Sequence, residues 1–153
     1  MVTATENETA IDTSNPILAA SGQAARVAGL KYAGNVTPEQ AWTLFSEGQA
    51  GLIDVRTLQE LQQTGHVPNA AHIEWLHGVE RSINKQFIAE LEALSDKNEV
   101  VLFLCRSGVR SISAAQAATQ AGFSNAYNVT EGFEGNGNPR LGWLNRKLPS
   151  IHE

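Results

Sequence analysis

The most constraining feature of the sequence is a continuous apolar run that leads into a short polar loop and then an alanine-rich segment. Residues 99–104 read EVVLFL, and an apolar run without polar alternation is typical of a parallel strand covered on both faces. Residues 105–110 read CRSGVR, and the pattern over 111–121 predicts a helix that ends at Gly122. A strand, a tight loop and a helix in this order form the repeating unit of an α/β domain.

The rest of the chain alternates in the same way. The helices that the apolar spacing predicts cover 16–30, 38–47, 57–63, 84–94, 111–121 and 141–148. The predicted strands cover 51–56, 70–73, 99–104 and 126–129. Thr37, Pro38 and Gln40 form the clearest helix start, because Thr37 can cap, Pro38 suits the first helical position and Gln40 completes a capping box. Connections too long for hairpins then predict an α/β fold with a central, mostly parallel sheet flanked by helices on both faces.

Composition narrows the class of protein. The 153 residues suffice for one domain, and we expect a tail and a possible helix over 1–35 and the domain over 36–150. The helix over 16–30, weakened by Gly22, could pack on the domain or on a partner. The net charge of -5 argues against a nucleic-acid surface. No apolar run spans a membrane, and the first ten residues carry no basic start of a secretory signal, so we expect a cytoplasmic protein without membrane contact.

Cys105 is the sole cysteine, so the chain can form no internal disulfide and offers no second cysteine as a resolving partner. It stands at the carboxyl end of the predicted strand, where ligand sites of open α/β sheets lie. The following amides and the helix N-terminus can converge on an anion, and Arg106 and Arg110 add positive charge, which together favour a reactive thiolate. Gly108 can take the positive φ that lets the loop curl. A buried core cysteine is the alternative, but it would not require two arginines, two serines and a glycine in the next six positions.

These residues resemble the rhodanese family. The segment 105–111, CRSGVRS, resembles the active-site loop of that family, and Leu52 to Arg56 with Glu60 resembles its first signature. Residues 65–70, GHVPNA, resemble its second signature, although the family usually has glycine in place of Asn69. The likeness runs from about 36 to 149. The glycine-rich segment 131–142 departs from the shortest members as an insertion.

The resemblance implies a thiosulfate sulfurtransferase with a rhodanese-like fold. The Cys105 thiolate would take the outer sulfur of thiosulfate or a similar donor and carry it as a persulfide. A thiol, cyanide or a protein thiol would accept it. The implied substrate-binding residues are Arg106, Ser107, Gly108, Val109, Arg110 and Ser111. Asp54, Arg56 and His66 are expected to brace the site structurally. The resemblance implies no cofactor. No metal is expected either, because His72 and His77 lack the partners and spacing of a zinc site. The chain is expected to be a monomer or a homodimer.

Three alternatives stay open. Phosphatases of related fold also have a cysteine, a loop and an arginine, but with five residues between the two, where this chain has four between Cys105 and Arg110. A shorter ring of amides suits a sulfur atom better than a phosphoryl group. The second alternative is a persulfide carrier that is loaded and unloaded by proteins, with the helix over 16–30 or the segment 131–142 as docking surfaces. The third is an interaction module without catalysis.

Overall fold

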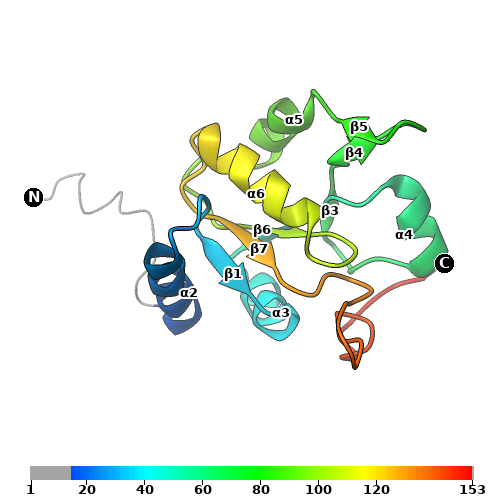
Figure 1. The fold of residues 1–153 in the computed structure, drawn as a ribbon, viewed down its shortest axis with the longest axis horizontal. Helices are drawn as coiled ribbons and strands as arrows, with labels where there is room; N and C mark the ends of the chain where they lie inside the picture. The colour runs from blue at the N-terminus through cyan, green and yellow to red at the C-terminus, as the bar shows by residue number, and fades with distance from the viewer. Residues whose placement is uncertain (1–14, 153) are drawn as a thin grey trace, which may run out of the picture.

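The computed structural model describes residues 15–152; residues 1–14, which hold nearly all of the expected N-terminal tail, and residue 153 lie outside it. Within the described residues, five strands form one parallel sheet in the order β1-β7-β6-β2-β3 (Figure 1). The strands are β1 (Gly34–Val36), β2 (Gly51–Asp54), β3 (Ala71–His72), β6 (Val101–Leu104) and β7 (Ala126–Val129). The predicted central strand is therefore the middle strand of the sheet.

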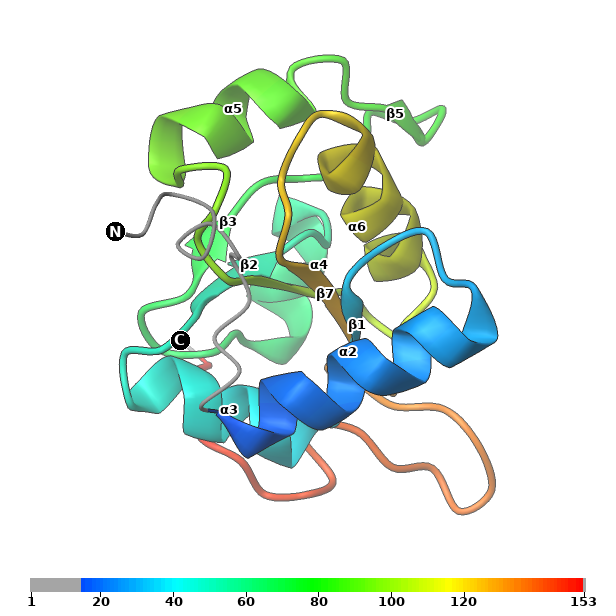
Figure 2. The same cartoon turned by 90° about the vertical axis from the view of Figure 1, so that its left-hand side faces the viewer.

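Helices cover both faces of this sheet. They are α2 (Pro16–Ala28), α3 (Pro38–Ser46), α4 (Leu58–Thr64), α5 (Phe87–Leu94) and α6 (Arg110–Gln120). Figures 1 and 2 show α5 and α6 on one face and α2 and α3 on the other. The predicted α/β class, with a parallel sheet between two helical layers, is confirmed.

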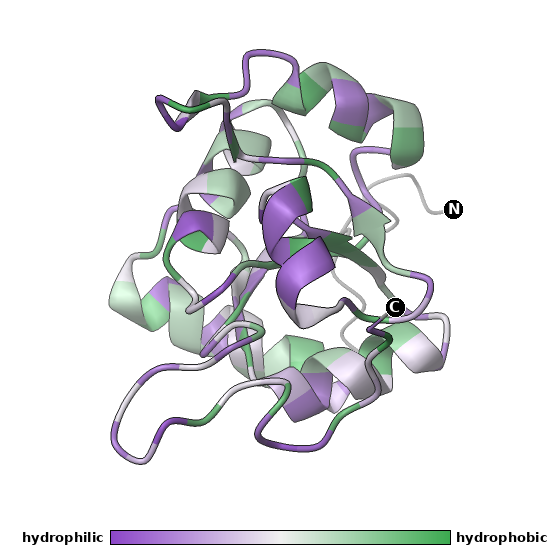
Figure 3. Cartoon of the chain, turned by 90° about the vertical axis from the view of Figure 1, so that its right-hand side faces the viewer, coloured by the Kyte–Doolittle hydropathy of each residue, from purple (hydrophilic) through white to green (hydrophobic). Residues whose placement is uncertain are grey.

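Strand β6 feeds two separate cores because its side chains alternate between the faces. Val101 and Phe103 pack in the core beneath α5 and α6, together with Cys105. Leu102 and Leu104 pack in the core on the α2 and α3 side. Figure 3 shows the hydrophobic central strands behind α4, a short helix that is largely hydrophilic and buries none of its residues. Among the described residues, no helix is both long and apolar enough to cross a membrane.

Side chains that cap the helices fix where they begin. The predicted capping box at α3 is present, since Gln40 N–H donates to Thr37 Oγ1 and Thr37 N–H donates to Gln40 Oε1. A second capping box opens α4, where Thr57 and Glu60 exchange the same two hydrogen bonds. Glu60 is thereby held at the first turn of α4, where it faces residues 105–110, the candidate active-site loop.

Helix α2 packs on the domain. Its inner side buries Leu18, Gly22 and Ala25, and Leu18 joins the core that includes Tyr127 of β7. Ser21 Oγ also donates to the carbonyl of Asn35 in β1 at 2.7 Å. From the sequence, this helix could pack either on the domain or on a partner protein. The buried contacts of Leu18, Gly22 and Ala25 show that it packs on the domain.

The predicted helix over 141–148 is wrong, since this segment consists of turns. Two of its main-chain N–H groups bond to another part of the chain: Trp143 donates to the Gly132 carbonyl, and Leu144 donates to the Phe133 carbonyl. The Trp143 side chain is fully buried and donates from Nε1 to the Pro149 carbonyl at 2.8 Å. These tertiary contacts outweigh the weak helical pattern.

Two features have no counterpart in the sequence-based prediction. The edge strand β1 is one, and a small antiparallel hairpin of β4 (Leu76–His77) and β5 (Ser82–Ile83) is the other. Both are too short to produce a periodic pattern. The hairpin precedes α5 and borders the pocket beside the active-site loop.

Candidate active site

The turn from β6 to α6 holds the Cys105 sulfur. Cys105 is 1% exposed and follows the last residue of β6. The Gly108 N–H donates to Sγ at 3.1 Å, and Ser111 Oγ lies 3.2 Å from Sγ on the first turn of α6. A main-chain donor and a hydroxyl thus converge on a single sulfur atom.

Two glycines allow the loop its shape. Gly108 has φ +96°, a value that L side chains rarely adopt. Gly132 has φ +72°, and a Cβ there would lie 2.4 Å from the carbonyl carbon and oxygen of Arg106. The second glycine therefore permits residues 131–135 to lie directly against the active-site loop.

The glycine-rich segment 131–142 is part of the scaffold of the site. Phe133 N–H donates to the Cys105 carbonyl at 2.8 Å, and Glu134 N–H donates to the Arg106 carbonyl at 2.9 Å. Asn136 Nδ2 donates to the Ser107 carbonyl at 2.6 Å. These bonds hold the main chain of the same loop whose Gly108 N–H points at the sulfur.

The arginines of the loop are both paired with carboxylates. Arg106 is about half exposed and donates from Nε to Glu134 at 3.2 Å. Arg110 donates from both terminal nitrogens to the two oxygens of Glu60, each at 2.8 Å. Neither guanidinium is a free positive charge, although the sequence placed both where an anionic donor would bind.

The pair of Glu60 and Arg110 shifts the pKa of both partners. Burial raises the pKa of Glu60, but hydrogen bonds from Arg110 and Thr57 outweigh it and lower that pKa to about 2. The hydrogen bond to Glu60 raises the pKa of Arg110, to which Cys105 and Asp54 also contribute electrostatically. Glu60 remains ionised across the physiological range and joins α4 to α6.

Asp54 and Arg56 form a buried brace at the end of β2. Arg56 is fully buried and holds Asp54 through Nε and Nη2, with the Nη2–Oδ2 distance at 2.7 Å. Its guanidinium also donates to the carbonyl of Gly65 and stacks over the Phe133 ring at 4.1 Å. The pair ties β2 to the loop after α4 and to the segment beneath Cys105.

His66 lies apart from the sulfur. Its main chain pairs with Ile151, and its ring borders a different pocket, together with Leu61, Ala70 and His72. Its main-chain bridge to Ile151 holds the last described residues against the loop after α4, and a bracing role close to Cys105 stays a prediction. Within residues 15–152, no group of three or more acidic, histidine or cysteine side chains could hold a metal ion.

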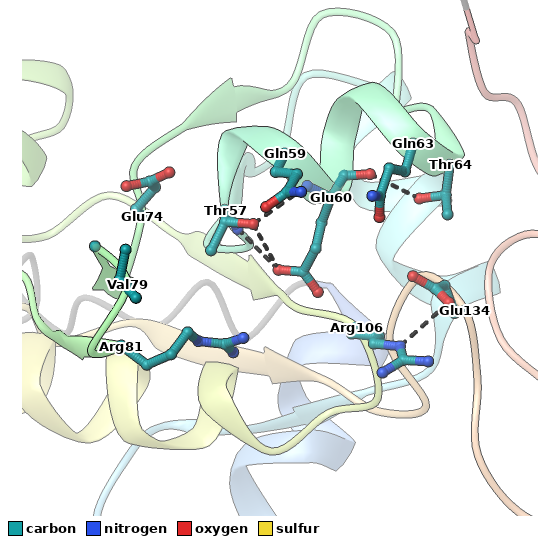
Figure 4. A pocket seen from close by; sticks show the side chains of 11 residues that line it. Thr57, Gln59, Glu60, Gln63, Thr64, Glu74, Val79, Arg81, Arg106 and Glu134 are labelled. Atoms are coloured by element: carbon teal, nitrogen blue, oxygen red, sulfur yellow. Dashed lines mark hydrogen bonds and ion pairs between the residues drawn. The ribbon is translucent and has the colours of Figure 1, made fainter.

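A pocket of about 660 Å³ opens beside the loop, between α4 and the β4–β5 hairpin (Figure 4). It reaches Arg106, the residue after Cys105, while Cys105 itself does not line it. Its charged lining residues are Glu60, Glu74, Arg81, Arg106 and Glu134. Figure 4 shows the Arg81 side chain extending from the hairpin toward the side where Arg106 lies.

The sequence-based prediction missed four residues that contact the loop or the sulfur's partners: Glu134, Asn136, Gly132 and Asn128. Asn128 had a usable signal, since an asparagine in the apolar strand AYNV must be buried and hydrogen-bonded. Its side chain accepts a hydrogen bond from Ser111. The other three residues lie in the glycine-rich segment 131–142, whose sequence does not indicate which part of the chain it contacts.

The protein is a parallel α/β domain with a cysteine in the turn from its central strand to a helix, at the carboxyl edge of the sheet, where ligand sites of such domains lie. The model of the Rhodanese-like domain family matches residues 37–137, and the chain belongs to this family. The resemblance inferred from the three motifs is confirmed.

Relatives and solved structures agree with this assignment. An uncharacterized protein of Rickettsia conorii is 42% identical over 110 residues, covering 69% of this chain and 86% of its own. Thiosulfate sulfurtransferase GlpE of Pseudomonas savastanoi pv. phaseolicola is 34% identical over 99 residues, covering 65% and 82%. The crystal structure of Rv0390 from M. tuberculosis superposes with a TM-score of 0.70 at 38% identity, covering 80% of this chain and 99% of its own.

Proposed function

We propose that the protein is a sulfurtransferase that moves sulfane sulfur from thiosulfate or a similar donor to a thiophilic acceptor through a persulfide on Cys105. The observation that carries the proposal is the Gly108 N–H aimed at Cys105 Sγ at the carboxyl end of β6. A main-chain donor at this position stabilises negative charge on sulfur, both on the thiolate and on the persulfide. The name of the GlpE relative supports thiosulfate as the donor.

The reaction has two half-steps. The Cys105 thiolate attacks the outer sulfur of thiosulfate, the bond between the two donor sulfurs breaks, and sulfite leaves with that bonding pair. Cys105 then carries an S–S⁻ group. The acceptor, for example cyanide, attacks the outer sulfur, leaves as thiocyanate and restores the thiolate, which is a ping-pong mechanism.

An anionic donor would bind most strongly to a cation that no carboxylate compensates. Glu134 and Glu60 compensate the charges of Arg106 and Arg110. Among the described residues, Arg81 forms no ion pair, and it lines the same pocket. We therefore assign the sulfonate end of the donor to Arg81, because it can offer two parallel N–H groups to an oxyanion.

A persulfide carrier that delivers to a protein thiol is a second candidate, favoured by exposed apolar side chains near the site. Val79 lines the pocket and is 98% exposed, and Val109 on the active-site loop is 67% exposed. Such side chains suit contact with a protein surface more than with a small anion. A carrier would show a high KM for thiosulfate and efficient transfer to a protein thiol.

The test is the intact mass before and after thiosulfate, for wild type and Cys105→Ser, followed by a thiocyanate assay with cyanide. We expect wild type alone to gain one sulfur, to lose it to cyanide and to turn over. A gain of sulfur without turnover would favour the carrier. No gain in a folded wild-type protein would reject thiosulfate as the donor, and phosphate-ester hydrolysis would be measured next.

A further inference from the structure

A chain of hydrogen bonds, buried at the sulfur and part-buried at its far end, runs from Cys105 across the sheet. Cys105 Sγ contacts Ser111 Oγ at 3.2 Å, and Ser111 donates to Asn128 Oδ1 in β7. Asn128 Nδ2 donates to Asn35 Oδ1 in β1 at 3.0 Å, and the Tyr32 hydroxyl donates to the same oxygen at 3.1 Å. Ser111 is fully buried, and Asn128 is 2% exposed.

The direction of this chain fits only the neutral thiol. A serine hydroxyl has one hydrogen, and Ser111 gives it to Asn128. Its oxygen can therefore only accept from Cys105, which requires an S–H group on the sulfur. When the proton leaves to water, the thiolate keeps the Gly108 N–H as a donor. Ser111 can supply a second donor only if Asn128 stops accepting its hydrogen.

Both asparagines can reverse the chain because a side-chain amide presents a donor and an acceptor that exchange places by rotation. After rotation, Asn128 Nδ2 donates to Ser111 Oγ, which frees the Ser111 hydrogen for the sulfur. Asn35 must rotate as well, and its two N–H groups then donate to Asn128 and to the Tyr32 oxygen. Every hydrogen bond of the chain is kept, and each one is reversed.

We propose that Asn128 and Asn35 form a reversible amide relay that lets Ser111 donate a hydrogen bond to the Cys105 thiolate and to its persulfide. Asn128 is thus a positioning residue of the sulfurtransferase, acting through Ser111. The inference rests on Cys105 being the nucleophile of the proposed function, but the reactivity of the thiolate can be measured without any sulfur transfer.

Aspartate at either amide position locks the relay in the accepting direction. In Asn128→Asp, the carboxylate can only accept, so it keeps the Ser111 hydrogen away from the sulfur. In Asn35→Asp, the carboxylate requires Nδ2 of Asn128, which again leaves Oδ1 facing Ser111. Asn35→Asp places the charge one residue further from the sulfur, so it remains informative if Asn128→Asp fails to fold.

The experiment is the rate of Cys105 alkylation by iodoacetamide from pH 6 to 10, in wild-type and Ser111→Ala backgrounds. Loss of one hydrogen bond to a charged group predicts that each aspartate variant slows alkylation about tenfold at pH 7, and that its pH profile moves to higher pH. In the Ser111→Ala background the same variants should change the rate less than about threefold, because the relay is already cut.

Arg110 interacts electrostatically with Cys105, and its other ionisable neighbours are Glu60 and Asp54. All of these residues are unchanged in every variant, so they do not account for a difference in the rate of alkylation. An equal slowing in both backgrounds would mean that the carboxylate acts directly by its charge, and it would overturn the relay. Unaltered rates with Ser111 present would overturn it too. Failure of the thiosulfate assay together with the expected alkylation pattern would reject thiosulfate as the donor and leave the relay standing.

Discussion

Glu60 and Arg110, fifty residues apart in the sequence, form a two-point ion pair with both N–O distances at 2.8 Å. Glu60 also caps α4 through the Thr57 N–H. One carboxylate therefore joins the start of α4 to the start of α6, directly beside the loop that follows Cys105. The arrangement explains why the Glu60 carboxylate stays ionised at low pH and why Glu60 neutralises the Arg110 charge within the fold.

Replacement of the Glu60 carboxylate tests how much this link between α4 and α6 stabilises the fold. We expect Glu60→Gln to lower the free energy of unfolding at pH 7 by about 1–3 kcal/mol, as charge-assisted hydrogen bonds contribute. The folded-state pKa of about 2 lies below the ordinary 4.5, so the extra stability is present above pH 4.5 and is lost as the pH falls toward 2.

Urea unfolding at pH 7, 4.5 and 2.5 should therefore show the two proteins converging in acid. Glu92→Gln is the matched control, since Glu92 pairs with Lys97 at 3.2 Å with both side chains about half exposed. It should cost less than about 1 kcal/mol. A constant difference between wild type and Glu60→Gln at every pH would contradict the assignment.

Arg81→Ala should weaken donor recognition. With its guanidinium removed, the charged lining of the pocket retains Glu60, Glu74 and Glu134 against Arg106. We expect KM for thiosulfate to rise about tenfold with kcat within twofold, because a contact made equally in the ground and transition states is lost. Arg81→Lys should recover part of the effect. Lys85→Ala, which removes a cation that lies outside this pocket, should leave both constants unchanged.

Gly132→Ala should damage the loop. Its Cβ would lie 2.4 Å from the Arg106 carbonyl and 2.5 Å from the Ser107 nitrogen, in a φ region unfavourable to alanine. We expect a loss of about 2–5 kcal/mol in the free energy of unfolding and a large loss of sulfur transfer. Gly29→Ala has nearly the same φ but no heavy atom within 4 Å of its Cβ, so strain alone should cost about 1 kcal/mol. Equal costs at the two positions would show that the close approach is not decisive.

Asp54→Ala should destabilise the fold rather than the chemistry. It leaves the fully buried Arg56 without its carboxylate, and an unpaired buried charge costs about 3–5 kcal/mol. Thermal unfolding measures the loss, and the folded fraction should retain Cys105 alkylation at the wild-type rate. A stable variant with slow alkylation would instead place Asp54 in the catalytic machinery.

Much of the fold was predictable because its signals are local. The apolar run at 99–104 and the helix after it became β6 and α6, and the Thr37 capping box begins α3 as expected. Strand 126–129 matches β7 residue for residue. The family could also be predicted from three motifs, because each is a short stretch of the sequence. Where a pattern was weak, as over 141–148, hydrogen bonds to Gly132 and Phe133 decided the conformation.

The sequence by itself thus determined the class of fold, the family and the position of Cys105 at a strand end, because propensity, capping and periodicity act over a few residues. Only the tertiary structure decided which carboxylates neutralise Arg106 and Arg110, which leaves Arg81, within residues 15–152, as a cation of the pocket without an ion pair. It also brought Asn128 and Asn35 behind Ser111. Such partners are chosen by distances across the sheet and between helices, and spacing along the chain does not encode them.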